Sequence, residues 1–228
     1  MAKEAIRIMI IAEAGINHLG ILNNAKKLVL AAKLSGADAV KFQTFWNIGR
    51  LKEYELTKDE FIELKNYCDK KDILFLSTPH CIEAIDFLDD LVPIHKLASP
   101  SIINKEFLEK IKSKNKPILL STGSIINSDG MATDNEISLA LNYLSDSEVI
   151  LLHCVSKYPC YFNHLERIEE LKKFGKTVGI SDHTKELYLP KFPVIEKHLK
   201  LDNIDCPDNN VSLTPHEFRT MVLHQREL

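Results

Sequence analysis

The chain has 228 residues, of which 45% are hydrophobic and 27% charged, and its formal net charge is −3. This composition predicts one soluble globular domain over residues 1–228, with a hydrophobic core of its own. The slightly acidic balance argues against a nucleic-acid or anionic-membrane partner, because binding to phosphates needs an excess of positive charge.

The five cysteines form no Cys-x-x-Cys pair, and their odd number favours reduced thiols over a disulfide framework. No apolar run approaches the ~18 residues of a membrane span. The first apolar run, residues 6–12, contains Arg7 and ends at Glu13, so it is too short for the apolar region of a signal peptide. We therefore expect a cytoplasmic protein.

Strand-like and helix-like segments alternate along the chain. Residues 6–12 are β-branched and nearly continuously apolar, which is typical of a strand buried on both faces. Asn23 or Asn24 can cap a helix that ends near Leu34. Further strands are predicted at 39–44, 73–76, 94–99, 117–120, 149–152, 177–180 and 193–195. Further helices are predicted at 57–69, 81–88, 105–112, 134–144 and 165–174, with a last one after Thr214.

The eight strand-like runs, most of them followed by a helix, predict a parallel sheet with right-handed crossovers. We predict an α/β fold of the (β/α)8 TIM barrel type, for which this chain is near the minimal length. A doubly wound open sheet is the alternative. The seventh βα unit is shortened, because residues 185–192 contain Pro190 and hardly make a helix long enough to cover strand seven.

Polar and ionisable side chains follow each apolar run. In a TIM barrel the carboxyl ends of the strands form the open mouth, so these side chains should converge there. Lys41 and Lys96 would be costly to bury without an anion beside them, and with hydroxyls from other strands they suit a phosphate or carboxylate. The alternative is that the two lysines form structural ion pairs with Glu13 or Glu196.

His183 and His198 follow the last two predicted strands. Imidazole nitrogens from adjacent strands can lie about 2.0–2.2 Å from one divalent metal. Two histidines at this separation are usually unrelated, but the chemistry of the other strand ends favours a metal site.

The remaining histidines receive a simpler interpretation. We expect solvent-exposed side chains on loops or helix faces for His80, His95, His164, His216 and His224. His18 follows the first strand, and its sequence position supports a substrate contact and the absence of one equally. His153 is either a core residue or a support for the site. Cys154 is interpreted as an inert buried thiol.

Nine short motifs occur in sequence order and carry a family resemblance. They are IAEAGINH at 11–18, VKFQT at 40–44, FLSTP at 75–79, KLAS at 96–99, LSTG at 120–123, LHCVSKYP at 152–159, SDHT at 181–184, EKH at 196–198 and PD at 207–208. Together they resemble the sialic acid synthase family, which includes N-acetylneuraminate, legionaminate and pseudaminate synthases. The resemblance covers nearly the whole chain.

The resemblance implies a transferase activity. Phosphoenolpyruvate would condense with an open-chain N-acetylated hexosamine (N-acetylmannosamine or a relative) and water, giving a nine-carbon 2-keto acid and phosphate. It implies a divalent metal, most often Mn²⁺ with Mg²⁺ or Co²⁺ as alternatives, on His183 and His198. The resemblance implies that phosphoenolpyruvate is contacted by Lys41, Thr78, Lys96, Ser99, Ser121 and Ser181. It implies that the sugar is contacted by Gln43, Tyr158 and Asp208, and that Asn17 is a further substrate contact. The implied catalytic carboxylate is Glu13.

These implied roles agree with the chemistry of the residues. The metal would polarise the sugar aldehyde as a Lewis acid. Glu13 would act as the acid–base partner of the water that adds to the substrate. Lys41 and Lys96 would hold the negative charges of phosphoenolpyruvate and stabilise the departing phosphate.

The chain departs from the family pattern in three places. Family members normally continue into a C-terminal antifreeze-like domain that reaches the partner subunit's site, whereas this sequence stops at Leu228. Ser101 stands where the family often has an acid, and the stretch between His183 and His198 is short. These departures leave two alternatives open: a degenerate, non-catalytic barrel that acts as a binding or assembly module, and an enzyme that uses a different aldehyde sugar. They also leave open whether the chain forms a homodimer.

Overall fold

The computed structural model describes residues 8–227. Eight parallel strands form one sheet in the order β3-β2-β1-β8-β7-β6-β5-β4. The strands are β1 (Met9–Gly15), β2 (Ala39–Thr44), β3 (Leu74–Pro79), β4 (His95–Leu97), β5 (Ile118–Ser121), β6 (Val149–Cys154), β7 (Thr177–Asp182) and β8 (Val194–His198). The last strand pairs with the first, and β3 packs against β4 without a ladder in the described part of the chain, so the barrel is nearly closed.

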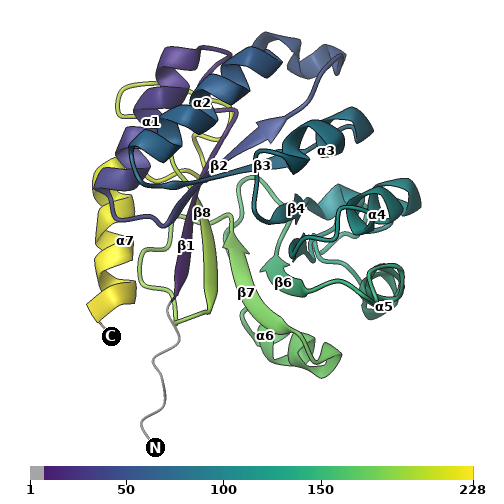
Figure 1. Cartoon of the computed structure of the whole chain (residues 1–228). Coiled ribbons are helices and arrows are strands. Elements are labelled where there is room, and N and C mark those ends of the chain that lie inside the picture. Colours follow the sequence, from purple (N-terminus) through teal and green to yellow (C-terminus); the bar gives the residue numbers. More distant parts are fainter. Residues whose placement is uncertain (1–7, 228) are drawn as a thin grey trace, which may run out of the picture.

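The helices surround the strands on the outside of the barrel, as Figure 1 shows. They are α1 (Leu22–Leu34), α2 (Lys58–Lys70), α3 (Ile82–Asp89), α4 (Lys105–Lys112), α5 (Asp134–Tyr143), α6 (Glu166–Leu171) and α7 (Pro215–Glu227), with 3-10 turns η1 (Gly49–Tyr54), η2 (Ser99–Ser101) and η3 (Lys172–Phe174). The predicted TIM barrel is therefore confirmed. The alternative of a doubly wound open sheet is wrong, because the last strand pairs with the first and the two end strands of the sheet, β3 and β4, pack against each other.

Local sequence signals account for several helix starts. Thr57 and Glu60 form the capping box predicted for α2, in which each side chain hydrogen-bonds to the other's backbone N–H. Asn104 caps α4 by accepting a hydrogen bond from the backbone N–H of Phe107. The helix predicted to end near Leu34 is confirmed as α1, but the predicted cap at Asn23 or Asn24 is wrong, since this helix begins at Leu22 after a residue with no side-chain cap.

Several strands run two or three residues past their predicted ends and so include polar residues. β1 pairs Glu13 with Lys41 on one side and with His198 on the other, and β7 pairs Asp182 with Lys197. These ladders form between segments far apart in sequence, which is why apolar patterns along the chain do not reveal them. β4 is shorter than predicted, and residues 6 and 7 of the first predicted strand lie outside the described residues.

The seventh unit has no helix between β7 and β8, which confirms its predicted shortening. The connector buries Leu189 and Phe192 instead, and the Gln225 side-chain amide of α7 donates a 2.7 Å hydrogen bond to the Leu189 carbonyl. A Cβ at Gly179 would lie 2.4 Å from the Val194 carbonyl oxygen, so β8 can start this close to β7 only beside a glycine.

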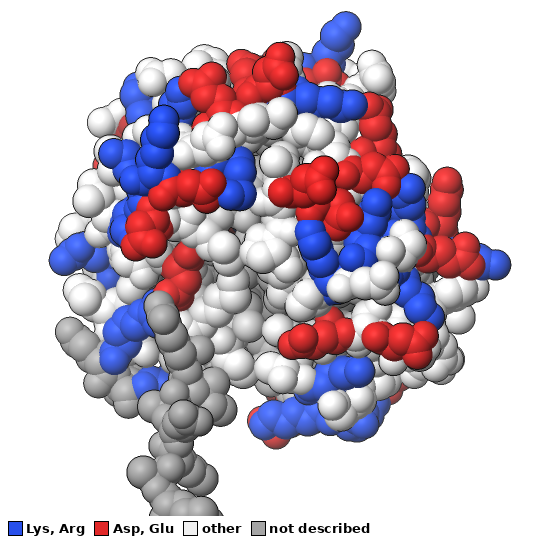
Figure 2. All heavy atoms as spheres, viewed as in Figure 1, with Lys and Arg blue, Asp and Glu red and all other residues white. Residues whose placement is uncertain are grey.

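None of the helices in residues 8–227 is long and apolar enough to cross a membrane. In Figure 2, lysines and arginines lie next to aspartates and glutamates around an uncharged central area of one face. Surface pairs such as Lys58–Glu83, 2.6 Å, illustrate this mixing of charge. On this face, positive charge is not gathered into one patch that would bind a polyanion.

Candidate active site

One cavity of about 220 Å³ opens at the carboxyl ends of the strands. It gathers side chains from all eight strands and from the segments that follow several of them, as expected for a TIM-barrel mouth. The structure brings eleven of the predicted site residues to its walls: Glu13, Lys41, Gln43, Thr78, Lys96, Ser99, Ser121, Tyr158, Ser181, His183 and His198.

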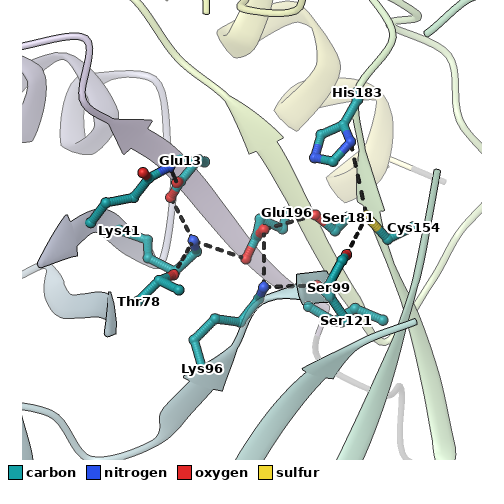
Figure 3. A network of polar contacts seen from close by, with 12 residues as sticks. Glu13, Lys41, Thr78, Lys96, Ser99, Ser121, Cys154, Ser181, His183 and Glu196 are labelled. Atoms are coloured by element: carbon teal, nitrogen blue, oxygen red, sulfur yellow. Dashed lines mark hydrogen bonds and ion pairs between the residues drawn. The ribbon is translucent and has the colours of Figure 1, made fainter. Parts of the chain in front are cut away.

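Buried ion pairs connect the two lysines of the cavity (Figure 3). The Lys41 ammonium lies 2.7 Å from Glu13 Oε2 and 3.6 Å from Glu196 Oε2. Lys96 lies 3.8 Å from Glu196 Oε1. All four side chains are less than 6% exposed. Each lysine thus lies within 4 Å of a carboxylate, as the ion-pair interpretation predicts.

Hydroxyl groups extend this network along the cavity wall. Lys41 donates a 2.9 Å hydrogen bond to Thr78 Oγ1, and Lys96 donates one of 2.7 Å to Ser121 Oγ. Ser181 donates a 2.8 Å hydrogen bond to Glu196 Oε1. These lysines and hydroxyls present several donors to one small space, which is the chemistry that binds a phosphate or carboxylate.

Glu13 and Glu196 share Lys41 but have pKa values displaced in opposite directions. Burial raises the pKa of Glu13, and the negative Glu196 adds to the rise, while Lys41 opposes it. Burial also acts to raise the pKa of Glu196, but attraction to Lys41 and Lys96 outweighs it and lowers this pKa to about 2. Glu196 therefore stays ionised, whereas Glu13 is the carboxylate that can take up and release a proton.

The two lysines differ as well. Burial acts to lower the pKa of Lys41, but Glu13 and Glu196 outweigh it, so this pKa is raised. Burial lowers the pKa of Lys96. Attraction to Glu196, 3.8 Å away, does not outweigh this effect, and repulsion by Lys41 adds to it. An anion bound between the lysines would favour the charged form of both.

His183 and His198 face each other at the ends of β7 and β8, with ring centroids 5.2 Å apart. The Nδ1 atom of His183 lies 2.8 Å from the Val155 carbonyl, and its Nε2 lies 2.8 Å from the Tyr158 hydroxyl. His198 Nδ1 lies 3.2 Å from Asp208 Oδ2, in a geometry too poor for a hydrogen bond, so both atoms are buried without a hydrogen-bond partner.

The side chains of His183, His198 and Asp208 offer nitrogen and oxygen ligands of the kind that bind a divalent cation. Two buried imidazoles line one cavity, and two buried atoms without a hydrogen-bond partner, His198 Nδ1 and Asp208 Oδ2, lie 3.2 Å apart beside it. Within residues 8–227, no group of three or more His, Cys, Asp or Glu side chains is arranged as a metal site. Two protein ligands would leave the remaining coordination positions to water and substrate.

Asn17 and Asp208 do not line the cavity, unlike the other predicted contacts. The Asn17 amide donates hydrogen bonds to the Leu199 carbonyl, 2.9 Å, and to Ser212 Oγ, 3.0 Å. Its Oδ1 accepts a 3.3 Å hydrogen bond from the Asp208 backbone. Asn17 therefore holds the loop that carries Asp208 beside His198, and the Asn17 side chain already has polar partners.

The segment between Glu13 and Asn17 needs a glycine. Gly15 has a φ of +51°, and a Cβ there would lie 3.1 Å from Asp208 Oδ2 and 3.3 Å from Glu13 Oε1. The AEAGINH motif thus allows Glu13 and Asp208 to approach each other.

Cys154 is buried as predicted, but it is not electrostatically inert. Its sulfur lies 3.5 Å from Ser99 Oγ and 3.9 Å from His183 Nδ1. Burial acts to raise the pKa of the thiol, but interaction with His183 outweighs it and lowers the pKa to about 7. This contact could not be predicted from neighbouring residues, because Cys154 ends β6 whereas His183 follows β7.

Two histidine predictions are wrong. His95 is fully buried, and its Nε2 lies 3.0 Å from Asp89 Oδ1. His80, expected on an exposed loop, lines the cavity. It was missed because β3 runs to Pro79, which places His80 directly after the strand end.

The other histidines lie away from the cavity walls. His18 is buried and accepts a 3.1 Å hydrogen bond from the Gly20 N–H, and His153 is buried with Nε2 2.5 Å from the Asn163 carbonyl. His216 is exposed, as expected.

Comparisons with known proteins agree with this fold and site. The chain belongs to the NeuB family, whose model matches residues 47–228. An uncharacterized protein of Methanocaldococcus jannaschii is 40% identical over 93% of this chain and 68% of its own length. An N,N'-diacetyllegionaminic acid synthase of Campylobacter jejuni is 37% identical over 97% of this chain and 76% of its own.

Solved structures show the same relationship. The N-acetylneuraminic acid synthetase of Leptospira borgpetersenii, solved with citrate, has a TM-score of 0.88 and 33% identity over 96% of this chain and 83% of its own. A truncated 3-deoxy-D-arabino-heptulosonate 7-phosphate synthase of Thermotoga maritima has a TM-score of 0.74 at 14% identity, which shows a shared fold. The resemblance to sialic acid synthases seen in the motifs is thus confirmed.

Proposed function

We propose that this protein condenses phosphoenolpyruvate with an N-acetylated hexosamine and water to give a nine-carbon 2-keto acid and phosphate. The observation that carries the proposal is one buried cavity that holds a lysine–carboxylate network beside two facing histidines. Membership of the NeuB family supports it. The free thiols of the described cysteines are compatible with the cytoplasm as its location.

The two lysines would bind phosphoenolpyruvate. Their charges lie on neighbouring parts of one wall, where they can hold the phosphate and carboxylate groups, with Thr78 and Ser121 as additional donors. The same charges would stabilise the phosphate as its C–O bond breaks. Ser99 and Ser181 complete the proposed set of contacts.

Glu13 would move the proton of the reaction. Overall, a C–C bond forms between the enol carbon and the sugar aldehyde, water adds to the carbon that carries the phosphate, and the bond to phosphate breaks. The adding water loses a proton, and Glu13, whose pKa is raised by burial, is placed to accept it. Glu196 stays ionised and holds the lysines in position.

His183 and His198 would hold the divalent cation, Mn²⁺ in our proposal with Mg²⁺ or Co²⁺ as alternatives. Such a cation supplies Lewis-acid polarisation of the sugar aldehyde. Gln43 and Tyr158 line the cavity, and Asp208 lies beside His198 behind its wall. These three side chains would orient the sugar.

The proposal is tested by phosphate release from phosphoenolpyruvate in the presence of Mn²⁺ and a panel of N-acetylated hexosamines that includes N-acetylmannosamine. We expect release with at least one sugar, and loss of release with a chelator or with His183→Ala. The exposed His216→Ala is the matched control and should retain activity. Absence of phosphate release with every sugar would overturn the proposal.

A second candidate is a barrel that binds the substrates without turning them over. The missing helix of the seventh unit favours it, because the connector between the two histidines is built differently from the other βα units. Calorimetry would distinguish the two. Binding of phosphoenolpyruvate and Mn²⁺ without phosphate release supports the binding module, whereas release supports the synthase.

A further inference from the structure

His80 is a cavity residue without an assigned role. Its backbone N–H donates a 2.9 Å hydrogen bond to the Thr44 carbonyl, which fixes the residue at the junction of β2 and β3. Its ring packs edge-on against Phe45, with centroids 6.3 Å apart and an interplanar angle of 71°. The side chain is half-buried and lines the same cavity as Lys41 and Lys96.

The Nε2 atom of His80 is buried and has no hydrogen-bond partner among the described residues. Buried polar nitrogens in folded proteins are nearly always paired with protein groups or water. An unpaired nitrogen on a side chain that lines a cavity is therefore a position where a ligand can complete the hydrogen bonding.

The charged groups that act on His80 are all cations. Burial, together with repulsion from Lys41, Lys96 and Arg50, lowers the pKa of His80 to about 4. The ring is consequently neutral near pH 7 and can donate a single N–H without adding a third charge to the lysine pair. A site with two ammonium groups and a neutral donor suits an oxyanion.

We propose that His80 is an additional substrate-binding residue that donates a hydrogen bond to an oxyanion of bound phosphoenolpyruvate, either its phosphate or its carboxylate. This inference rests on the proposed function and names a residue that the nine motifs do not include. It makes the residue after the FLSTP motif part of the anion site.

Anion binding should change the protonation of His80. The bound negative charge offsets the field of the lysines, so the pKa of the imidazole rises in the complex. A group whose pKa rises on binding takes up a proton, and binding then strengthens as the pH falls toward the raised pKa. His80 should therefore contribute more proton uptake on binding as the pH is lowered.

The test is isothermal titration calorimetry of phosphoenolpyruvate on the full chain at pH 6.0 and 7.5, in pairs of buffers with different ionisation enthalpies. His80→Phe keeps a ring against Phe45 and removes the donor. His80→Gln keeps a donor but cannot titrate. His216→Gln, exposed on α7, is the control. Thermal unfolding of each variant reports whether it is folded.

We expect His80→Phe to weaken phosphoenolpyruvate binding roughly tenfold, the loss of one hydrogen bond to a charged group. His80→Gln should recover most of the affinity but lose the His80-dependent proton uptake. Titrations with inorganic phosphate and with pyruvate show which oxyanion is contacted, because only the contacted group loses affinity in His80→Phe.

Two outcomes are distinguishable failures. Wild-type affinity and wild-type proton uptake in a folded His80→Phe variant overturn this inference and leave the proposed function intact. A wild-type chain that binds neither phosphoenolpyruvate nor inorganic phosphate overturns both. If His80→Phe does not fold, His80→Gln decides, since unchanged proton uptake in that variant rules His80 out.

Discussion

At the scale of single residues, the candidate site depends on two glutamates that share one lysine. Glu13 and Glu196 are both nearly fully buried, yet only Glu196 lies within 4 Å of both Lys41 and Lys96. The second cation decides which carboxylate stays ionised. Glu13 is left as the group whose protonation can change during a reaction.

Replacing Glu13 by Gln should lower kcat by a factor on the order of 10²–10⁴, the usual contribution of a general acid–base group. In the wild type, kcat should fall as the pH drops through the raised pKa of Glu13, because the group must be ionised to accept a proton. Steady-state kinetics across pH measure both effects. Glu106→Gln, exposed on α4, is the control. An unchanged pH profile in Glu13→Gln would contradict this role.

Replacing Glu196 by Gln should reduce stability at pH 7 by about 3–5 kcal/mol, because Lys41 and Lys96 then lose a buried counter-charge. The pKa of Glu196 is lowered from 4.5 to about 2 in the folded chain. Its contribution is therefore present above pH 4.5 and is lost as the pH falls toward 2.

Urea unfolding between pH 7 and pH 3 tests this prediction. The wild type should lose more stability across pH 4.5–3 than Glu196→Gln does. Parallel pH profiles for the two proteins would show that Glu196 does not contribute in this way.

At the scale of elements, the shortened seventh unit is held by a buried ion pair. Lys197 contacts Asp182 through a short ion pair, and both side chains are 0% exposed. Thr184 donates two hydrogen bonds to Asp182, of 3.0 Å from its N–H and 3.1 Å from its hydroxyl. The paired residues stand next to His183 and His198, so this cluster fixes the ends of β7 and β8 where a helix is missing.

Lys197→Met should destabilise the chain by about 3–5 kcal/mol, because it leaves Asp182 buried and unpaired. The double variant Asp182→Asn/Lys197→Met should regain most of this stability, since no buried charge remains. Denaturant unfolding measures both, with Lys191→Met, exposed in the connector, as the control.

Mn²⁺ titration of the same variants tests whether the ion pair also positions the histidines. A stable double variant with weakened Mn²⁺ binding indicates that the charges set the histidine geometry. A double variant with wild-type Mn²⁺ affinity shows that the pair acts on stability alone.

At the scale of the whole molecule, the positive charge that suits an anionic substrate lies inside the barrel mouth. The chain has a net charge of −3, and charges of both signs alternate on the face in Figure 2. Attraction of the proposed anionic substrate would therefore depend on Lys41 and Lys96 in the cavity, where solvent and salt screen charge less than at the surface.

Phosphoenolpyruvate should stabilise the folded chain, because the site exists only when the strands are assembled. At 100 times its Kd, a ligand adds about 2.7 kcal/mol to the free energy of unfolding. Thermal unfolding should show this increase in the wild type and in His183→Ala, but not in Lys96→Met. An equal increase in Lys96→Met would place the binding site elsewhere.

Much of this protein follows from its sequence. The alternation of apolar runs and helical segments predicted the barrel. The polar residues after each run, together with the family resemblance, predicted eleven of the side chains that line the cavity. These features can be predicted locally. Consecutive apolar residues indicate a strand buried on both faces, and the carboxyl end of each strand in a parallel barrel lies at the mouth. The nine motifs in order predicted the family.

Only the tertiary structure decided how these groups are paired. Glu196 lies between two lysines from other strands, Asn17 supports Asp208 rather than lining the cavity, and His80 enters the cavity wall. Lys197, between Glu196 and His198 in sequence, points away from them and pairs with Asp182. Successive side chains of a strand point to opposite faces, which the sequence shows. The register between neighbouring strands depends on contacts between residues distant in sequence, and this register determines which polar side chains pair.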